Sequence, residues 1–147
     1  MRKFEVTSQY INDGINIPKR ATTNSAGYDF ESAEDIIIKA GEIKLVPTGI
    51  KAIFPRDEVL LIYCRSSLPY KRELSLPNGV GVIDADYYNN IDNEGAIFVQ
   101  LRNFGNSNQL IKKGERIAQG IFSKYHLTDD DADTSNKRIG GFGSSGK

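Results

Sequence analysis

The chain has 147 residues, in which 19 lysine and arginine side chains balance 19 aspartate and glutamate side chains, with one cysteine and one histidine. This length predicts a single domain that can bury a core without disulfides. One cysteine and one histidine are too few for a zinc site built from cysteines or for a multi-histidine metal site. The zero net charge argues against a protein that coats nucleic acid. The available chemistry is therefore that of carboxylates, hydroxyls, backbone amides and ions that arrive with a ligand.

The sequence gives no sign of membrane insertion or export. No stretch approaches the roughly 20 apolar residues of a membrane span, and the residues after Met1 alternate in polarity where a signal peptide would have an apolar core. The lone cysteine fits a reducing compartment. We therefore expect a cytoplasmic protein with no membrane and no nucleic-acid partner.

Short apolar runs with a period near two dominate the sequence and predict β-strands. Phe4 and Val6 alternate with polar residues, and turn-forming residues such as Ala40-Gly41 separate the later runs. The expected strands cover residues 36–38, 43–46, 50–54, 59–63, 80–83, 96–101 and 116–122. Many short strands separated by turns are typical of an all-β sandwich, barrel or jelly roll.

One short helix is expected over residues 67–74, where Pro69 can occupy an early helical position. The end of the chain differs from the rest, because an acidic run at 129–133 is followed by a tail rich in glycine and serine. Such a tail cannot form a core strand and should be mobile without ligand. We therefore divide the chain into a β domain, residues 1–127, and a C-terminal arm, residues 128–147. The isolated Phe142 indicates that the arm is more than a frayed terminus.

The segment 78–87 carries the first candidate for chemistry. Asp84 ends an apolar run that follows Asn78 and two glycines. The apolar neighbours favour partial desolvation of the carboxylate, which suits a general base. The alternative is an ordinary β-turn with aspartates that cap loop amides, and the local sequence alone favours the turn.

Other polar segments are individually weak. Arg65-Ser66-Ser67, after an apolar strand, could bind an anion or simply begin a helix. The tail from Gly141 to Lys147 matches the spacing of a phosphate loop, but no helix follows it. We expect Cys64 to be a small core residue and His126 to be solvated.

Taken in order, five segments resemble the five motifs of the trimeric dUTPase family: residues 26–29, 65–67, 78–87, 114–119 and 140–146. The resemblance extends from about Ala26 to the end of the chain. It implies a jelly-roll-like double-sheet monomer (the β-clip of that family) and a homotrimer with active sites at subunit interfaces. It also implies hydrolysis of dUTP to dUMP and pyrophosphate with Mg²⁺, which keeps uracil out of DNA and supplies dUMP for thymidylate synthesis.

The resemblance also implies roles for single residues. Asp84 would position and deprotonate the attacking water, and Tyr87 would lie against the deoxyribose and exclude a 2′-hydroxyl. Asn78 would read uracil together with the backbone of the following strand, and Asp29 would hold the hydrated Mg²⁺ through water. The remaining substrate contacts implied by the family are Gly81, Val82 and Ile83 for the base, Phe142 of the arm over the base, and Arg65, Ser66, Ser67, Gln119, Gly143, Ser144 and Ser145 near the phosphates.

The sequence departs from the family in two places. The arginine expected five residues before Phe142 is replaced by Lys137, with Arg138 one position later, so either cation is a candidate for the terminal phosphate. The turn after the third motif is enlarged and covers residues 88–94. We expect a longer hairpin loop there, and its role is open.

Two alternative functions remain. A dCTP deaminase of the same fold would need a catalytic glutamate where this chain has Gln100, and an amide cannot serve as acid or base. A trimeric regulatory module that binds a protein partner through its loops is the other alternative. The intact Asp84 and the intact arm favour the hydrolase.

Overall fold

The structure is a computed structural model that describes residues 1–132 and 138–143. Twelve strands occur in this part of the chain, and the prediction of an all-β protein is confirmed. They are β1 Lys3–Val6, β2 Lys19–Arg20, β3 Tyr28–Glu31, β4 Ile36–Ile38, β5 Ile43–Pro47, β6 Ile50–Ile53, β7 Glu58–Cys64, β8 Leu74–Ser75, β9 Gly81–Asp84, β10 Phe98–Asn103, β11 Gln109–Ile111 and β12 Arg116–Lys124.

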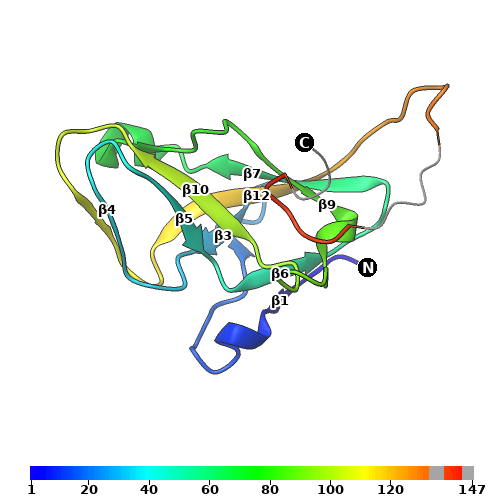
Figure 1. Ribbon diagram of the computed structural model, residues 1–147, viewed down its shortest axis with the longest axis horizontal. Coiled ribbons are helices and arrows are strands. Elements are labelled where there is room, and N and C mark those ends of the chain that lie inside the picture. The colour runs from blue at the N-terminus through cyan, green and yellow to red at the C-terminus, as the bar shows by residue number, and fades with distance from the viewer. Residues whose placement is uncertain (133–137, 144–147) are drawn as a thin grey trace.

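The strands form a jelly-roll-like arrangement of antiparallel sheets (Figure 1). The largest sheet has the order β2-β3-β12-β7-β9, and a second has the order β5-β10-β8. Two further pairs, β1-β6 and β4-β11, form separate two-stranded sheets. Three single-turn helices connect strands in the described residues: η1 Ser8–Tyr10, η2 Leu68–Arg72 and η3 Ala85–Tyr87. None of the described helices is long and apolar enough to cross a membrane.

A single apolar cluster joins the two larger sheets. Along β7, residues alternate between buried and half-buried positions, so that Leu60 and Ile62 point into the cluster. They meet Phe30 from the same sheet and Val99 and Leu101 from β10. The alternation read from the sequence therefore reports the real inner face of the sheet.

Close packing explains a glycine in the middle of β12. A Cβ atom on Gly120 would lie 2.7 Å from Cε2 of Phe30 and 3.1 Å from Cδ1 of Leu60. The absence of a side chain lets the Phe30 ring pack directly on the strand. Phe30 also meets Phe4 edge to face, with 5.4 Å between the ring centroids.

The expected helix is shorter than the sequence indicated. It is a single π-helical turn, Leu68–Arg72, with Pro69 near its first position as predicted. Glu73 adopts a left-handed conformation with φ of 52°, which ends the turn, and Leu74 begins β8. The strands β2, β3, β8 and β11, of two to four residues each, were not among the expected strands.

Candidate active site

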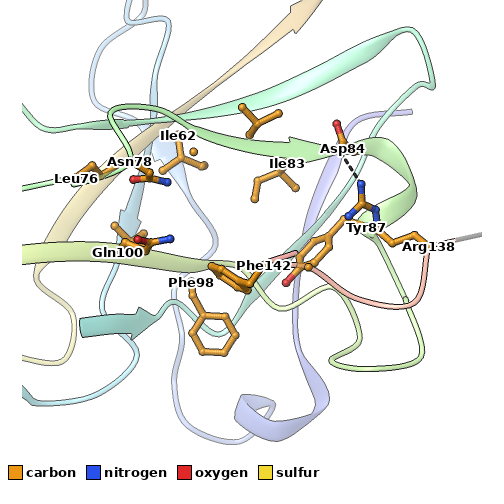
Figure 2. Close-up of a pocket in the computed structure, with 14 residues that line it drawn as sticks. Ile62, Leu76, Asn78, Ile83, Asp84, Tyr87, Phe98, Gln100, Arg138 and Phe142 are labelled. Carbon is orange, nitrogen blue, oxygen red and sulfur yellow. Dashed lines mark hydrogen bonds and ion pairs between the residues drawn. The ribbon is translucent and has the colours of Figure 1, made fainter. Parts of the chain in front are cut away.

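Most of the predicted base-binding and catalytic residues line one pocket beside β9 (Figure 2). Segment 78–87 supplies one wall, β10 supplies a second, and residues 138–142 of the arm cover it. The lining includes Asn78, Gly81, Val82, Ile83, Asp84, Tyr87, Arg138 and Phe142 from the predicted set. It also includes Ile62, Leu76, Phe98, Val99, Gln100 and Gly141, which sequence reasoning did not assign to substrate binding. We name this site the base pocket.

Asp84 stands where β9 ends and η3 begins. Its backbone is extended, with φ of −82° and ψ of 155°, and the chain then turns into η3. The strand therefore does not continue through Tyr87, and the turn brings Tyr87 inward to line the pocket beside Asp84. The Asp84 side chain is 51% exposed, so the expected partial desolvation is wrong for the single chain.

The Asp84 carboxylate already has a cationic partner. Nη2 of Arg138 lies 2.5 Å from Oδ2 of Asp84, and Nε of Arg138 lies 2.6 Å from Oδ1 of Asp86. A third bond, from Nη1 of Arg138 to the carbonyl oxygen of Gly140, measures 3.0 Å. The guanidinium is thus held by three acceptors, and its ion pairs stabilise the arm against segment 78–87. Arg138 contacts the predicted general base directly.

Tyr87 is the buried aromatic wall of the base pocket. Its side chain is 6% exposed, and its hydroxyl donates to the carbonyl oxygen of Ala96 at 2.7 Å. Nδ2 of Asn93 donates to the same hydroxyl at 2.8 Å. Burial raises the pKa of Tyr87, and the bond from Asn93 offsets part of that effect. The phenol therefore stays neutral and acts as a rigid ring.

The arm covers the pocket with its aromatic residue. The rings of Phe142 and Phe98 lie with centroids 6.3 Å apart and an interplanar angle of 67°. Phe142 remains 60% exposed, so most of its ring is free to contact a bound base. Gly143 follows with φ of 92° and lies outside the pocket lining. Lys137, Ser144 and Ser145 lie outside the described residues.

Residues from the first, second and fourth motifs gather at a second place, which we name the arginine cluster. It contains Asp29 of β3, Arg65 after β7, and Arg116 at the start of β12. Oδ1 of Asp29 lies 3.9 Å from Nε of Arg65, and Oδ2 lies 3.6 Å from Nη1 of Arg116. Asp29 therefore holds two guanidinium groups side by side. Sequence reasoning missed Arg116, although it lies inside the fourth motif.

Gln119, Ser66 and Ser67 belong to the same neighbourhood. Gln119 is paired with Asp29 across β3 and β12, and its Nε2 donates to the carbonyl oxygen of Cys64 at 3.4 Å. A Cβ atom on Gly27 would clash with the Gln119 amide, which explains the glycine of the first motif. Ser66 and Ser67 follow Arg65 at the same edge, with Ser66 exposed and Ser67 half-buried.

Asp84 of the base pocket and Arg65 of the arginine cluster lie toward opposite ends of β7. In the antiparallel pairing of β7 with β9, Asp84 is opposite Val59, whereas Arg65 follows Cys64 at the other end. The strand between Val59 and Cys64 spans about 17 Å at the usual rise per residue. Among the described residues, the lining of the base pocket includes no member of the arginine cluster.

The residues present fit a divalent cation only if a phosphate supplies most of its ligands. No three histidine, cysteine, aspartate or glutamate side chains converge on one point within residues 1–132 and 138–143. Asp29 offers one carboxylate beside two cations. Mg²⁺ is commonly bound by one or two carboxylates together with substrate phosphates and waters. The donor set therefore fits Mg²⁺ that enters with a polyphosphate.

The cysteine and the histidine take no part in either group. Cys64 is half-buried at the end of β7, and burial raises the pKa of its thiol, which disfavours the nucleophilic thiolate. His126 is exposed beyond β12, as expected.

Comparisons with known proteins agree with this architecture. The family model described as dUTPase matches residues 13–146. The chain is 54% identical, over 99% of its length and 98% of the relative, to the deoxyuridine 5′-triphosphate nucleotidohydrolase of Lactococcus lactis. The structure superimposes on the crystal structure of dUTPase from Streptococcus mutans with a TM-score of 0.83 and 48% sequence identity. The match covers 86% of this chain and 98% of the S. mutans chain.

A more distant likeness concerns the fold alone. The structure of a variant dUTPase from phage phi11 of S. aureus, which shows how a structural Mg(II) ion is coordinated, superimposes with a TM-score of 0.73 at 18% identity. That match covers 92% of this chain and 97% of the phage chain.

Proposed function

This chain belongs to the dUTPase family, and we propose that it hydrolyses dUTP to dUMP and pyrophosphate at sites shared between copies of the chain. The proposal rests on the base pocket. Its lining brings together Asp84, Tyr87, Asn78 and Phe142, the residues to which the family motifs give catalytic and base-binding roles. In this reading residues 128–147 form the arm that closes the site, and residues 1–127 form the β domain.

The separation of the two groups supports a shared site. Asp84 and Arg65 of one chain lie toward opposite ends of β7, which favours a site where a second copy brings its arginine cluster to the base pocket of the first. A closed ring of three copies satisfies this requirement, since each copy then gives one group and receives the other. Because the motifs of the chain resemble those of the trimeric dUTPases, we propose a ring of three copies with active sites at its interfaces.

The chemistry follows from the charges at the two groups. The Asp84 carboxylate accepts a proton from a water molecule whose oxygen attacks the α-phosphorus of dUTP. The bond between that phosphorus and the oxygen bridging to the β-phosphorus breaks, and pyrophosphate leaves. Arg65, Arg116 and the hydroxyls of Ser66 and Ser67 neutralise the charge on the phosphate oxygens. Mg²⁺ bound to the triphosphate would add to this neutralisation, with Asp29 reaching its hydration shell.

Arg138 has to change partner during the reaction. Its ion pair with Asp84 keeps the carboxylate occupied in the ligand-free chain. A triphosphate offers stronger acceptors than an exposed carboxylate, so we propose that Arg138 transfers to a phosphate when the nucleotide binds. That transfer frees Asp84 for the water. It also assigns to Arg138 the terminal-phosphate role for which Lys137 was the other candidate.

A nucleotide panel tests the proposed function. We expect the purified protein with Mg²⁺ to release pyrophosphate from dUTP and little from dTTP, dCTP or UTP, because Tyr87 and Phe142 wall the pocket and two amides, those of Asn78 and Gln100, line it. Pyrophosphate is measured enzymatically for each nucleotide at equal concentration.

The same panel separates the alternatives. Ammonia release from dCTP would identify a deaminase, although the pocket presents the Gln100 amide where that reaction needs an acid. Binding of dUTP without release of pyrophosphate would identify a regulatory module. Either result would contradict the proposed hydrolysis.

A further inference from the structure

The loop of residues 88–95, between η3 and β10, contains the enlarged turn 88–94, whose role the sequence left open. It follows Tyr87 directly and lies between the base pocket and the N-terminal strands. Its side chains make hydrogen bonds to Tyr87 and to the N-terminal part of the chain, and its backbone makes one to the arm. The density of these contacts distinguishes it from a simple surface insertion.

The inner contacts fix the Tyr87 hydroxyl from two sides. It donates to the carbonyl oxygen of Ala96 at 2.7 Å and accepts from Nδ2 of Asn93 at 2.8 Å. The Tyr87 ring therefore cannot tilt within its pocket without losing both bonds. Because the residue is 6% exposed, water cannot readily replace either partner.

Asn90 fixes the orientation of the Asn93 amide. Nδ2 of Asn90 donates to Oδ1 of Asn93 at 2.8 Å, and the backbone N–H of Gly95 donates to the same oxygen at 3.1 Å. With its oxygen occupied by two donors, Asn93 turns its NH₂ group toward Tyr87. Asn90 is itself 7% exposed, and its second Nδ2 bond goes to the carbonyl oxygen of Tyr87 at 2.8 Å.

The outer contacts anchor the loop to the N-terminal part of the chain. The Glu94 carboxylate accepts from Nζ of Lys51 at 2.8 Å and from Oγ of Ser8 at 2.6 Å. The Lys51 ammonium lies 5.0 Å from the centroid of the Tyr88 ring. The hydrogen bond from Lys51 lowers the pKa of Glu94, which keeps this anchor charged near neutral pH. The inner bonds to Tyr87 are thus held by a fixed frame.

The arm rests on the same loop. The backbone N–H of Asp92 donates to the carbonyl oxygen of Ile139 at 3.0 Å. A Cβ atom on Gly140 would lie 2.7 Å from Oδ2 of Asp92, and one on Gly141 would lie 2.9 Å from Cε1 of Tyr87. The two glycines therefore let the arm lie directly against the loop and the Tyr87 ring. Phe142 follows Gly141 immediately, so the loop also positions the arm, and with it Phe142, over the base pocket.

We propose that Asn93 is a positioning residue for sugar selection: through the 88–95 loop it holds the Tyr87 ring as a fixed wall that leaves no room for a 2′-hydroxyl. This inference rests on the proposed function, in which Tyr87 lies against the deoxyribose of dUTP. A pocket that only lacks favourable contacts rejects an added hydroxyl weakly. The Tyr87 ring, whose hydroxyl is held by two hydrogen bonds, excludes the 2′-hydroxyl of ribose sterically. Ribose can enter only if the ring moves and both of these bonds break.

Two substitutions of Asn93 test the inference, and they differ in how many of its hydrogen bonds they remove. Asn93→Ala removes the bond to Tyr87 and the bonds that Asn93 accepts. Asn93→Asp keeps the accepting oxygen and removes the NH₂ donor, so it preserves the loop frame. We expect both to lower the ratio of kcat/KM for dUTP to that for UTP by roughly fivefold to tenfold, the effect of one hydrogen bond. Asn89→Gly is the matched control, since Asn89 has φ of 54° and its side chain contacts Lys51, not Tyr87.

A binding measurement separates positioning from general stability. The ratio of Kd for UMP to Kd for dUMP, measured by calorimetry, should fall in both Asn93 variants and stay unchanged in the Asn89→Gly control. A lower melting temperature with both ratios unchanged in Asn93→Asp would overturn the inference and leave Asn93 a structural residue. If Asn93→Ala does not fold, Asn93→Asp decides. Failure of the unmodified protein to hydrolyse dUTP would instead contradict the proposed function.

Discussion

Replacement of Asp84 by asparagine is expected to reduce the turnover of dUTP by about 10²–10⁴-fold while the fold and nucleotide binding persist. An amide of the same shape cannot accept a proton from the attacking water. Asp84 is half-exposed at the end of β9, so the substitution leaves no buried charge without a partner. The amide oxygen can still accept a hydrogen bond from Arg138, which preserves the contact between the arm and segment 78–87.

Asp86→Asn is the matched control for this variant. Asp86 also pairs with Arg138, at 2.6 Å, but its side chain is 63% exposed and lies outside the lining of the base pocket. We expect near-normal turnover from this control. Steady-state pyrophosphate release and calorimetric binding of a non-hydrolysable dUTP analogue check both variants. Undiminished turnover in Asp84→Asn would remove Asp84 from the mechanism.

Deletion of residues 139–147 is expected to leave the β domain folded and to reduce turnover on the order of 10²-fold or more. The buried core cluster runs from Phe4 to Ala118 in the described part of the chain, so truncation removes none of it. The loss of Phe142 opens the base pocket to water and removes the cover that orients the base. Circular dichroism with thermal unfolding checks the fold, and pyrophosphate release checks turnover.

A single substitution in the arm is the control for the truncation. Ile139 is 55% exposed and contacts the 88–95 loop through its backbone carbonyl, so Ile139→Ala should behave like the unmodified protein. Phe142→Ala should fall between the control and the truncation. If the truncated chain unfolds at a much lower temperature, residues 139–147 belong to the β domain, and the division into domain and arm is wrong.

The sequence predicted the strands whose own pattern determines them. β7 and β12 are long and rich in apolar residues, and along β7 the buried positions alternate with half-buried ones on the inner face of the sheet. β2 is two exposed basic residues, Lys19 and Arg20, that form a strand only because β3 is there to pair with them. The local sequence of residues 19–20 does not predict the pairing with β3. The same reason explains why β8 and β11 were not predicted.

The candidate site was predicted as a set of residues but not as an arrangement. Motif order supplied Asp84, Tyr87 and Phe142, and the structure brings these three to one pocket. The ion pair between Arg138 and Asp84 joins residues 54 positions apart, and no spacing rule predicts it. The separation of Arg65 from Asp84 depends on the register of β7 with β9, which only the folded sheet determines. The enlarged turn was recognised by its length, whereas the bond from Asn93 to Tyr87 required coordinates.

Complementation between two inactive variants tests most directly whether one chain supplies Asp84 and another supplies the arginine cluster. Asp84→Asn and Arg65→Ala chains are purified separately, mixed, partly unfolded and refolded together, and assayed for pyrophosphate release from dUTP. In mixed assemblies some sites combine an intact Asp84 from one chain with an intact Arg65 from another, so we predict that activity returns well above that of either variant alone. Refolding each variant by itself is the control. A mixture that forms mixed assemblies and stays as inactive as its components would contradict the shared site.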